Sequence, residues 1–241
     1  MKIIKLSIII PVFDEEASVS LILNKIKEVH LINNIKKEFV IINDNSQDHS
    51  RKIIQAFNEE NPTLEILFIN NETNQGKGAS IQKGISKATG DYLIIQDADL
   101  EYNPEEYNLL LKPIIEDVAD VVYGSRFLKN KGRKTSYFWH YNANKFLTFL
   151  SNLFSGLKLT DMETCYKLLD TKMVKSLQLK EKRFGFEPEV TAKISRIKNI
   201  RLKEVSISYE SRKYIHGKKI GWKDGVRAIY CIVKYGLFKI T

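Results

Sequence analysis

Asp97 and Asp99 stand one residue apart directly after an apolar run, in the stretch GDYLIIQDADLEY that begins at Gly90. Alternate residues of an extended chain point to the same side, so both carboxylates can face one ligand. Two carboxylates this close repel each other unless a cation lies between them, and their oxygens suit Mg²⁺ or Mn²⁺ held jointly with substrate phosphates. The pair therefore predicts a metal and diphosphate site. The alternative is an acidic loop that stabilises the start of a helix at Pro104.

The segments around this pair alternate between short apolar runs and stretches with apolar residues three or four positions apart. The first pattern predicts strands and the second predicts helices. Strands are expected over 6–13, 38–44, 64–70, 91–99 and 119–127, with helices between them. This alternation favours an α/β fold, in which helices flank a mostly parallel sheet.

Acidic residues follow several of the expected strands. Asp14, Asp44 and Asp97 each stand at or just after a strand end. The carboxyl ends of parallel strands meet at one edge of a sheet, where ligands bind, so these three side chains should share one crevice. Asp14 and Ser46 are also expected to serve as N-caps of the helices that follow.

Charge is distributed unevenly along the chain. Residues 1–127 carry 13 Lys and Arg against 20 Asp and Glu, whereas residues 128–241 carry 25 against 9. The acidic half suits cations, and the basic half suits phosphate groups, an anionic membrane surface or nucleic acid. Solvated faces of opposite sign are the alternative. A nucleic-acid binder would leave the acidic strand ends unexplained, so no nucleic-acid partner is expected.

Several classes of protein are excluded by missing patterns. The chain has no Walker A motif, no G-x-G-x-x-G fingerprint and no EF-hand loop. Its two cysteines, Cys165 and Cys231, provide neither a disulfide framework nor a four-cysteine zinc site, which favours a cytoplasmic location. The longest apolar runs fall short of the roughly 20 residues that cross a bilayer. We therefore expect no membrane-spanning helix.

Seven segments, in order along nearly the whole chain, resemble the family 2 glycosyltransferases with the GT-A fold. They are PVFDEE, INDNSQD, NQGKGASIQKGISKATGDYLIIQDADLEY, VVYGSRF, TDMETCYKL, RFGFEPEVTAKI and YESRKYIHGKKIGWKDG. The most similar branch contains dolichyl-phosphate mannose synthase and the polyprenyl-phosphate glucosyltransferases. The resemblance implies a Rossmann-like GT-A catalytic domain over 1–212, with a nucleotide-sugar-binding half (1–127) and an acceptor-binding half (128–212). A basic loop and an amphipathic helix would follow over 213–241.

The resemblance also implies a set of site residues. Asp44 matches the carboxylate that accepts from the base, although Asn43 stands where the family usually has a second Asp. The residues implied for the nucleotide sugar are Pro11, Phe13, Glu15, Asp44, Lys77, Asp97, Lys218 and Lys219. Those implied for catalysis are Asp99, Asp161 and Arg212, with Asp97 and Asp99 on the metal and Arg126 and Arg133 on the acceptor phosphate.

The activity implied is inverting transfer of a hexose, of glucose or mannose type, from a UDP- or GDP-sugar to a polyprenyl phosphate, assisted by Mg²⁺ or Mn²⁺. A phosphomonoester is largely an anion at neutral pH, because its second pKa is near ~6, so a strong general base is dispensable. Asp161 would then act as base or only position substrate, with Glu163 as a weaker candidate. Transfer to a saccharide acceptor and a non-catalytic nucleotide-sugar-binding subunit remain as alternatives.

Two stretches suggest contact with a membrane surface. Residues 137–157 are rich in aromatics, and residues 223–241 carry apolar side chains at helical spacing beside basic ones. A basic amphipathic helix with aromatics can lie in the headgroup layer of an anionic membrane. Peripheral contact with the cytoplasmic face is therefore expected, together with a membrane-protein partner or a second copy. The alternative is a helix that packs on the core or forms a dimer interface.

Overall fold

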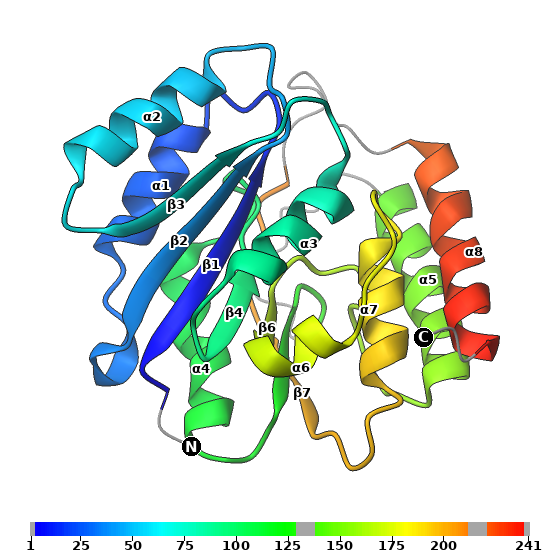
Figure 1. Ribbon diagram of the computed structural model, residues 1–241. Coiled ribbons are helices and arrows are strands. Elements are labelled where there is room, and N and C mark those ends of the chain that lie inside the picture. Colours follow the sequence, from blue (N-terminus) through cyan, green and yellow to red (C-terminus); the bar gives the residue numbers. More distant parts are fainter. Residues whose placement is uncertain (1–2, 129–137, 212–220, 239–241) are drawn as a thin grey trace.

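The computed structural model describes residues 3–128, 138–211 and 221–238. Within these residues, a sheet has the strand order β3-β2-β1-β4-β6-β5-β7, and helices cover both of its faces (Figure 1). The strands are β1 (Lys5–Val12), β2 (Lys36–Asn43), β3 (Glu65–Asn70), β4 (Tyr92–Ile95), β5 (Val121–Ser125), β6 (Lys167–Asp170) and β7 (Leu202–Ser206). The α-helices are α1 (Val19–Glu28), α2 (Ser50–Glu60), α3 (Lys77–Lys87), α4 (Tyr107–Ile115), α5 (Phe138–Ser155), α6 (Thr171–Ser176), α7 (Phe186–Ile194) and α8 (Trp222–Leu237).

The sheet is parallel except at one strand. β1 pairs in parallel with β2 and β4, β2 with β3, and β5 with β7, whereas β6 runs antiparallel between β4 and β5. The predicted mostly parallel α/β sheet is confirmed, and each expected strand is present with its ends shifted by a few residues. Strands β6 and β7 were not predicted. β6 is four residues long, so it is too short to show an alternating pattern.

The expected N-caps are wrong. Asp14 has a left-handed backbone (φ 48°), and α1 begins after Ser18 instead. The Asp14 carboxylate accepts from the Gln47 backbone N–H (2.8 Å), and the Asp14 backbone N–H donates to Ser46 Oγ (3.0 Å). Both side chains thus join the loops after β1 and β2 to each other instead of starting helices. The loops that follow β1 and β2 are therefore linked by hydrogen bonds at the carboxyl edge of the sheet.

The central strands and α3 are closely packed against each other. Ile8, Ile9 and Ile10 in β1 are fully buried. A Cβ atom at Gly84 would lie 2.5 Å from Ile9 Cγ2 and 2.9 Å from Ile42 Cδ1, so α3 approaches the sheet as closely as a glycine allows. Figure 1 shows α3 on one face of the sheet, with α1, α2 and α4 on the other. The N-terminus of α3 is thereby held at the carboxyl edge.

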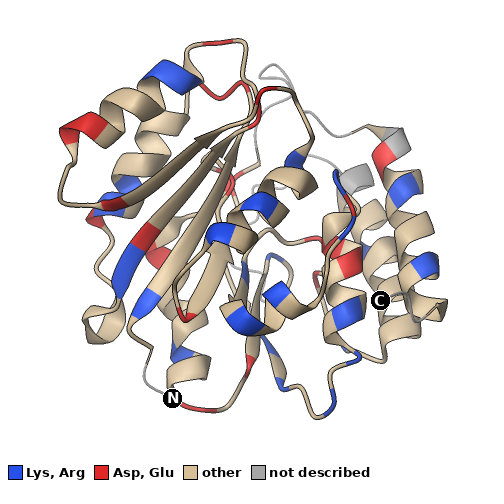
Figure 2. Ribbon diagram, viewed as in Figure 1, with Lys and Arg blue, Asp and Glu red and all other residues tan. Residues whose placement is uncertain are grey.

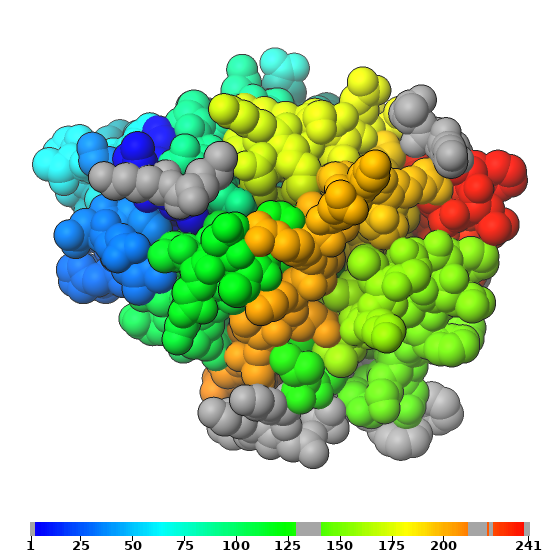
Figure 3. Space-filling view, turned by 90° about the horizontal axis from the view of Figure 1, so that it is seen from below, coloured from blue at the N-terminus to red at the C-terminus, as the bar shows by residue number. Residues whose placement is uncertain are grey.

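Three helices form a second layer beside the sheet. Figures 1 and 3 show α5 next to α8, and α7 packs against both. Ala192 of α7 shares a small core with Cys231 and Tyr235 of α8. The predicted C-terminal amphipathic helix corresponds to α8, and it packs on the fold through one side only. None of the helices among the described residues is long and apolar enough to cross a membrane.

Candidate active site

Two of the predicted carboxylates are joined by the turn that begins α3. Asp44, after β2, accepts from the backbone N–H groups of Gln75 (2.9 Å) and Gly76 (2.7 Å). The next residue, Lys77, places its Nζ 2.8 Å from Asp97 Oδ1 and 2.9 Å from Oδ2. The strand ends of β2 and β4 therefore meet at this turn, as the sequence predicted. We call residues 76–78 the GKG turn.

The GKG turn requires glycine. Gly76 has φ 93°, a conformation that strains any residue with a Cβ atom, and a Cβ there would lie 2.6 Å from Lys182 O. The turn leads directly into α3, whose first backbone N–H groups and helix dipole favour an anion. The glycines at 76 and 78 make room for the main chain of residues 181–183, which packs against the turn. The Lys77 ammonium and the helix dipole at this point suit an anionic group such as a phosphate.

Lys77 is a partly buried cation, with its side chain 23% exposed. Burial acts to lower the pKa of Lys77, but the nearby carboxylate of Asp97, with Cys165 and Glu187, outweighs it and raises that pKa well above the ordinary value. Glu187 Oε1 lies 3.9 Å from Lys77 Nζ. Lys77 is therefore protonated throughout the neutral range, and it offsets the charge of Asp97.

Asp97 and Asp99 supply oxygen ligands for a divalent cation. Asp99 Oδ1 accepts from the Glu101 backbone N–H (3.1 Å), which fixes the carboxylate relative to its loop. No group of three or more His, Cys, Asp or Glu among the described residues is arranged to hold a metal ion by itself. Mg²⁺ is commonly bound by one or two carboxylates together with substrate phosphates, so the pair fits an ion that arrives with a diphosphate.

Arg126 and Asp161 form the second half of the site. Arg126, just after β5, binds Asp161 with two nitrogens, Nε to Oδ2 and Nη2 to Oδ1, at 2.7 Å each. Asp161 is fully buried and also accepts from the Arg126 backbone N–H (3.0 Å). Burial acts to lower the pKa of Arg126, but the Asp161 charge outweighs it and raises that pKa well above the ordinary value. Arg126 also lies over the rings of Phe127 and Tyr209.

Two buried glutamates belong to the candidate site in addition to the main predicted residues. Glu163 Oε1 and Glu187 Oε2 are buried, with no hydrogen-bond partner among the described residues. Burial, followed by the charge of Glu187, raises the pKa of Glu163 to about 8. Buried polar atoms in proteins usually have a hydrogen-bond partner, so these two carboxyl groups are available to a polar ligand. Glu163 was only a weaker candidate from the sequence, and Glu187 was not singled out; its place in the first turn of α7, in the segment RFGFEPEV, was the available signal.

The remaining predicted residues fall into two groups. Pro11 lies in β1 beside Ile42, and Phe13 and Glu15 follow that strand; the Glu15 backbone N–H donates to Ser50 Oγ (2.8 Å). These lie at the carboxyl edge, as expected. The others lie outside the described residues: Arg133, Arg212, Lys218 and Lys219.

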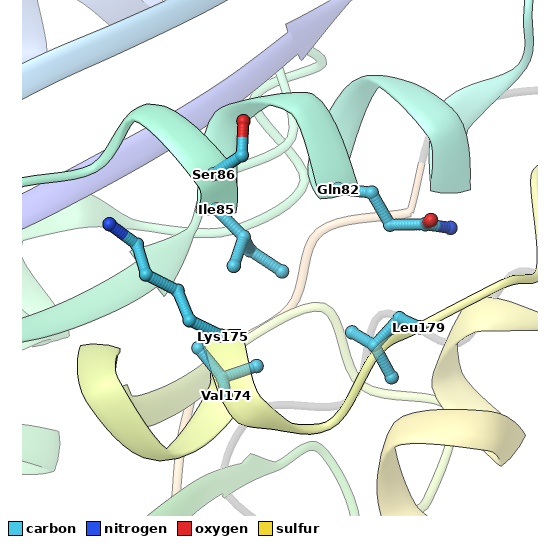
Figure 4. A pocket seen from close by; sticks show the side chains of 6 residues that line it. All are labelled: Gln82, Ile85, Ser86, Val174, Lys175 and Leu179. Carbon is cyan, nitrogen blue, oxygen red and sulfur yellow. The ribbon is translucent and has the colours of Figure 1, made fainter. Parts of the chain in front are cut away.

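The distribution of charge is uneven around the sheet, and one depression of the surface lies away from the predicted site residues. Figure 2 shows acidic segments at the loops that follow the central strands, with basic segments along α3, α6, α7 and α8. A separate depression of about 360 Å³ lies between α3 and α6 (Figure 4). Its lining consists of Gln82, Ile85, Ser86, Val174, Lys175 and Leu179, and none of the predicted site residues is among them.

The comparisons with known proteins identify the family. Residues 7–178 match the family model described as Glycosyl transferase family 2. Because this match covers more than half of the chain, the chain belongs to glycosyl transferase family 2, the class of enzyme that its motifs predicted.

Relatives of established name are distant. The chain is 25% identical, over 97% of its own length and 96% of the other, to UDP-N-acetylglucosamine–dolichyl-phosphate N-acetylglucosaminyltransferase of Methanococcus voltae. It is 28% identical, over 88% of its length, to undecaprenyl-phosphate 4-deoxy-4-formamido-L-arabinose transferase of Proteus mirabilis, of which it spans 62%. It also spans 52% of an uncharacterised Methanocaldococcus jannaschii protein at 30% identity. Several relatives are thus considerably longer than the matched region.

A solved structure confirms the fold. Glucosyl-3-phosphoglycerate synthase from Mycobacterium tuberculosis, in complex with Mn²⁺, uridine diphosphate and phosphoglyceric acid, superposes with a TM-score of 0.70. The superposition covers 98% of this chain and 80% of that chain, at 13% sequence identity. The predicted GT-A fold is therefore confirmed. At this sequence identity the likeness concerns the fold alone.

Proposed function

We propose that the protein transfers a hexose from a UDP- or GDP-hexose to a polyprenyl phosphate, with inversion at the anomeric carbon and with Mg²⁺ or Mn²⁺. The observation that carries the proposal is the GKG turn, which joins Asp44 to Asp97 and presents Lys77 and a helix N-terminus at one point. The M. voltae and P. mirabilis relatives are named for transfer to dolichyl and undecaprenyl phosphate, which supports this class of acceptor.

On the donor side, the chain neutralises negative charge. Asp97 and Asp99 would hold the divalent cation, which supplies Lewis-acid stabilisation of the departing diphosphate. Lys77 contributes a second, fixed positive charge, and the first turn of α3 contributes backbone N–H donors. Asp44 keeps the turn in place through two backbone hydrogen bonds, besides any contact with the base.

On the acceptor side, the geometry favours a phosphate nucleophile. Arg126 is a side chain of 13% exposure held by a fully buried carboxylate, so its guanidinium is fixed in direction before substrate arrives. A fixed guanidinium suits phosphate oxygens. Both oxygens of Asp161 already accept from Arg126, so Asp161 orients this cation and does not need to accept a proton. Arg133 and Arg212 are proposed to add further positive charge.

The hexose is proposed to lie between these two charged groups. Its hydroxyls both donate and accept hydrogen bonds, and the buried oxygens Glu163 Oε1 and Glu187 Oε2 have no partners among the described residues. Binding a hydroxyl to each would satisfy oxygens that are otherwise costly to bury. A sugar in this position has the diphosphate on the Lys77 side and the acceptor phosphate on the Arg126 side, as direct displacement requires.

The acceptor lipid is proposed to reach the site from a membrane to which the protein binds through α5 and α8. Large apolar side chains are exposed on both helices: Phe146, Phe149, Leu153, Val226, Ile229, Tyr230 and Leu237. Figure 3 shows the two helices side by side at the surface, and their sequences include the basic residues Lys145 on α5 and Arg227 on α8. An apolar face with basic residues fits an anionic headgroup layer on the cytoplasmic side. We call this surface the α5–α8 face.

The deciding experiment incubates purified protein with UDP- and GDP-hexoses, short polyprenyl phosphates or saccharide acceptors, and Mn²⁺, Mg²⁺ or chelator. Lipid-linked sugar that forms only with metal is the expected product. Product on saccharide alone would move the assignment to glycan synthesis. Donor binding without turnover on any acceptor would assign a nucleotide-sugar-binding subunit.

A further inference from the structure

The segment between α6 and α7 supports the GKG turn from outside. Lys182 O accepts from the Ala79 backbone N–H (2.9 Å), which is one of the first free N–H groups of α3. A Cβ atom at Gly78 would overlap the carbonyl oxygen of Glu181, so the two main chains are in direct contact. The position of the GKG turn therefore depends on the position of residues 180–183.

The side chain of Glu181 connects this segment to α8. Its Oε2 accepts from Arg227 Nη2 (2.7 Å) and Nε (3.1 Å). Its Oε1 accepts from Tyr235 Oη (2.9 Å) and lies 3.4 Å from Lys234 Nζ. Glu181 is only 4% exposed, and Tyr235 is fully buried. All three partners belong to α8, so one buried carboxylate joins that helix to the support of the GKG turn.

The other contacts of the segment make this link specific. The backbone N–H groups of Lys180 and Glu181 donate to the buried carboxylate of Glu189, at 2.7 to 2.9 Å, which fixes the segment on α7. Arg227 also lies over the ring of Tyr230 (4.9 Å), which is 52% exposed on the α5–α8 face. The chain of contacts thus runs from the exposed face through Arg227 and Glu181 to the first turn of α3.

We propose that Glu181 is a positioning residue that couples α8, and the surface it carries, to donor binding at the GKG turn. The proposal rests on the proposed donor role of that turn. Removing the Glu181 charge leaves Arg227 without its buried ionic partner and breaks the link between residues 180–183 and α8, while Glu189 and Gln82 still hold that segment. The support that Lys182 O gives to the start of α3 is then weakened. The Arg126 and Asp161 pair has no contact with Glu181, so acceptor binding stays as it was.

Glu181→Gln keeps the shape of the side chain and removes its charge. We expect about a 5- to 10-fold higher KM for the nucleotide sugar, with kcat and the acceptor KM within about twofold of wild type. Arg227→Gln should have a similar effect, and the double variant should be no worse than either single one because the two residues act as a pair. Additive losses would contradict the proposed link.

Glu38→Gln is the matched control. Glu38 is also 4% exposed and accepts from Ser7 and Thr89, at the opposite end of β2 from the site. The Glu38→Gln variant should have a Tm lowered about as much as that of Glu181→Gln, and its KM for the donor should be unchanged. An equal rise in donor KM for both variants would reduce Glu181 to a general stability role and overturn the proposal.

Amide hydrogen exchange at Ala79 tests the coupling without turnover. Exchange of the Ala79 N–H should become at least about 10-fold faster in Glu181→Gln and stay unchanged in Glu38→Gln. Unchanged exchange in Glu181→Gln overturns the proposal, whatever the substrates are. Absence of transfer by the wild type with every donor would instead refute the proposed function, and the exchange measurement would still decide the role of Glu181.

Discussion

Arg126 and Asp161 form a two-point ion pair, with Nε to Oδ2 and Nη2 to Oδ1 both at 2.7 Å, at a fully buried carboxylate. Breaking such a pair leaves an uncompensated buried charge, which is far more damaging than loss of a surface ion pair. The pair therefore fixes a cation where the acceptor phosphate is proposed to bind, and this relationship gives the first prediction.

Asp161→Asn should lower kcat/KM for the polyprenyl phosphate by roughly 10- to 100-fold, because Arg126 loses the carboxylate that orients it. The pH profile of kcat should keep its shape, since a phosphate nucleophile needs no base. Steady-state kinetics between pH 6 and pH 9 check both points. If the wild type loses activity at the acidic end of this range and the variant does not, Asp161 accepts a proton in the reaction.

Asp99→Ala should abolish turnover, at least about 1,000-fold, because the divalent cation loses an oxygen ligand beside the leaving group. Chelator should do the same to the wild type, and added Mn²⁺ should restore only the wild type. Glu105→Ala, an exposed acidic residue after the same loop, is the control with full activity expected. Circular dichroism should show both variants folded; an active Asp99→Ala enzyme would remove the metal from the mechanism.

Glu163→Gln should change how stability depends on pH. Burial, and then the charge of Glu187, raises the pKa of Glu163 from 4.5 to about 8. Between those two pH values the folded state keeps a proton that the unfolded state has released, so this group makes the protein less stable as pH rises through that window. Urea unfolding from pH 5 to pH 9 should show the variant gaining stability over wild type toward high pH. A constant difference would mean that Glu163 is ionised throughout.

Gly84→Ala should lower the free energy of unfolding by ~1–3 kcal/mol, because the added methyl group would meet Ile9 at 2.5 Å in a close-packed core. Gly225→Ala in α8, where nothing lies within 4 Å of the added Cβ, is the control. That change should be neutral or stabilising by up to ~1 kcal/mol. Chemical denaturation separates the two, and equal effects would mean that α3 can move away from the sheet.

Replacing Phe149 and Leu153 by serine should reduce binding to vesicles that contain anionic lipid by about 10-fold or more. Each loses a side chain that is about two thirds exposed on the α5–α8 face, 64% and 66% respectively. A matched control replaces Leu21 and Leu109, exposed apolar residues of α1 and α4, and should leave binding unchanged. Co-sedimentation measures both, and equal losses would mean that no particular face binds the membrane.

The first half of the fold was predictable because its signals are local. Apolar runs that end in Asp44 and Asp97 mark parallel strands and place both carboxylates at one edge. The contacts between them were not predictable, because the Gly76 N–H and the Lys77 ammonium reach them only through tertiary packing. For the same reason Asp14 was misread as an N-cap: its type suits a cap, but its backbone at φ 48° joins two loops.

The second half was less predictable. β6 gives almost no periodic signal in four residues, and Glu187 looks like an ordinary acidic residue in the first turn of a helix. Whether such a residue faces solvent or a site depends on how α7 packs. The resemblance located Asp161 and Arg126 separately, and only the structure shows that they bind each other.

The reversed direction of β6 has a consequence for how such an enzyme can change. Parallel strands reach the active edge at their ends, whereas β6 reaches it at its beginning, so the preceding residues, with Asp161 and Glu163, are delivered there by a segment that belongs to no crossover helix. The residues proposed for the acceptor therefore come from a different part of the chain than β1, β2 and β4, whose ends are proposed to bind the nucleotide. Acceptor preference can then change through substitutions in that segment, within the limits set by its contacts with Ile95 of β4 and the adjacent Gln96.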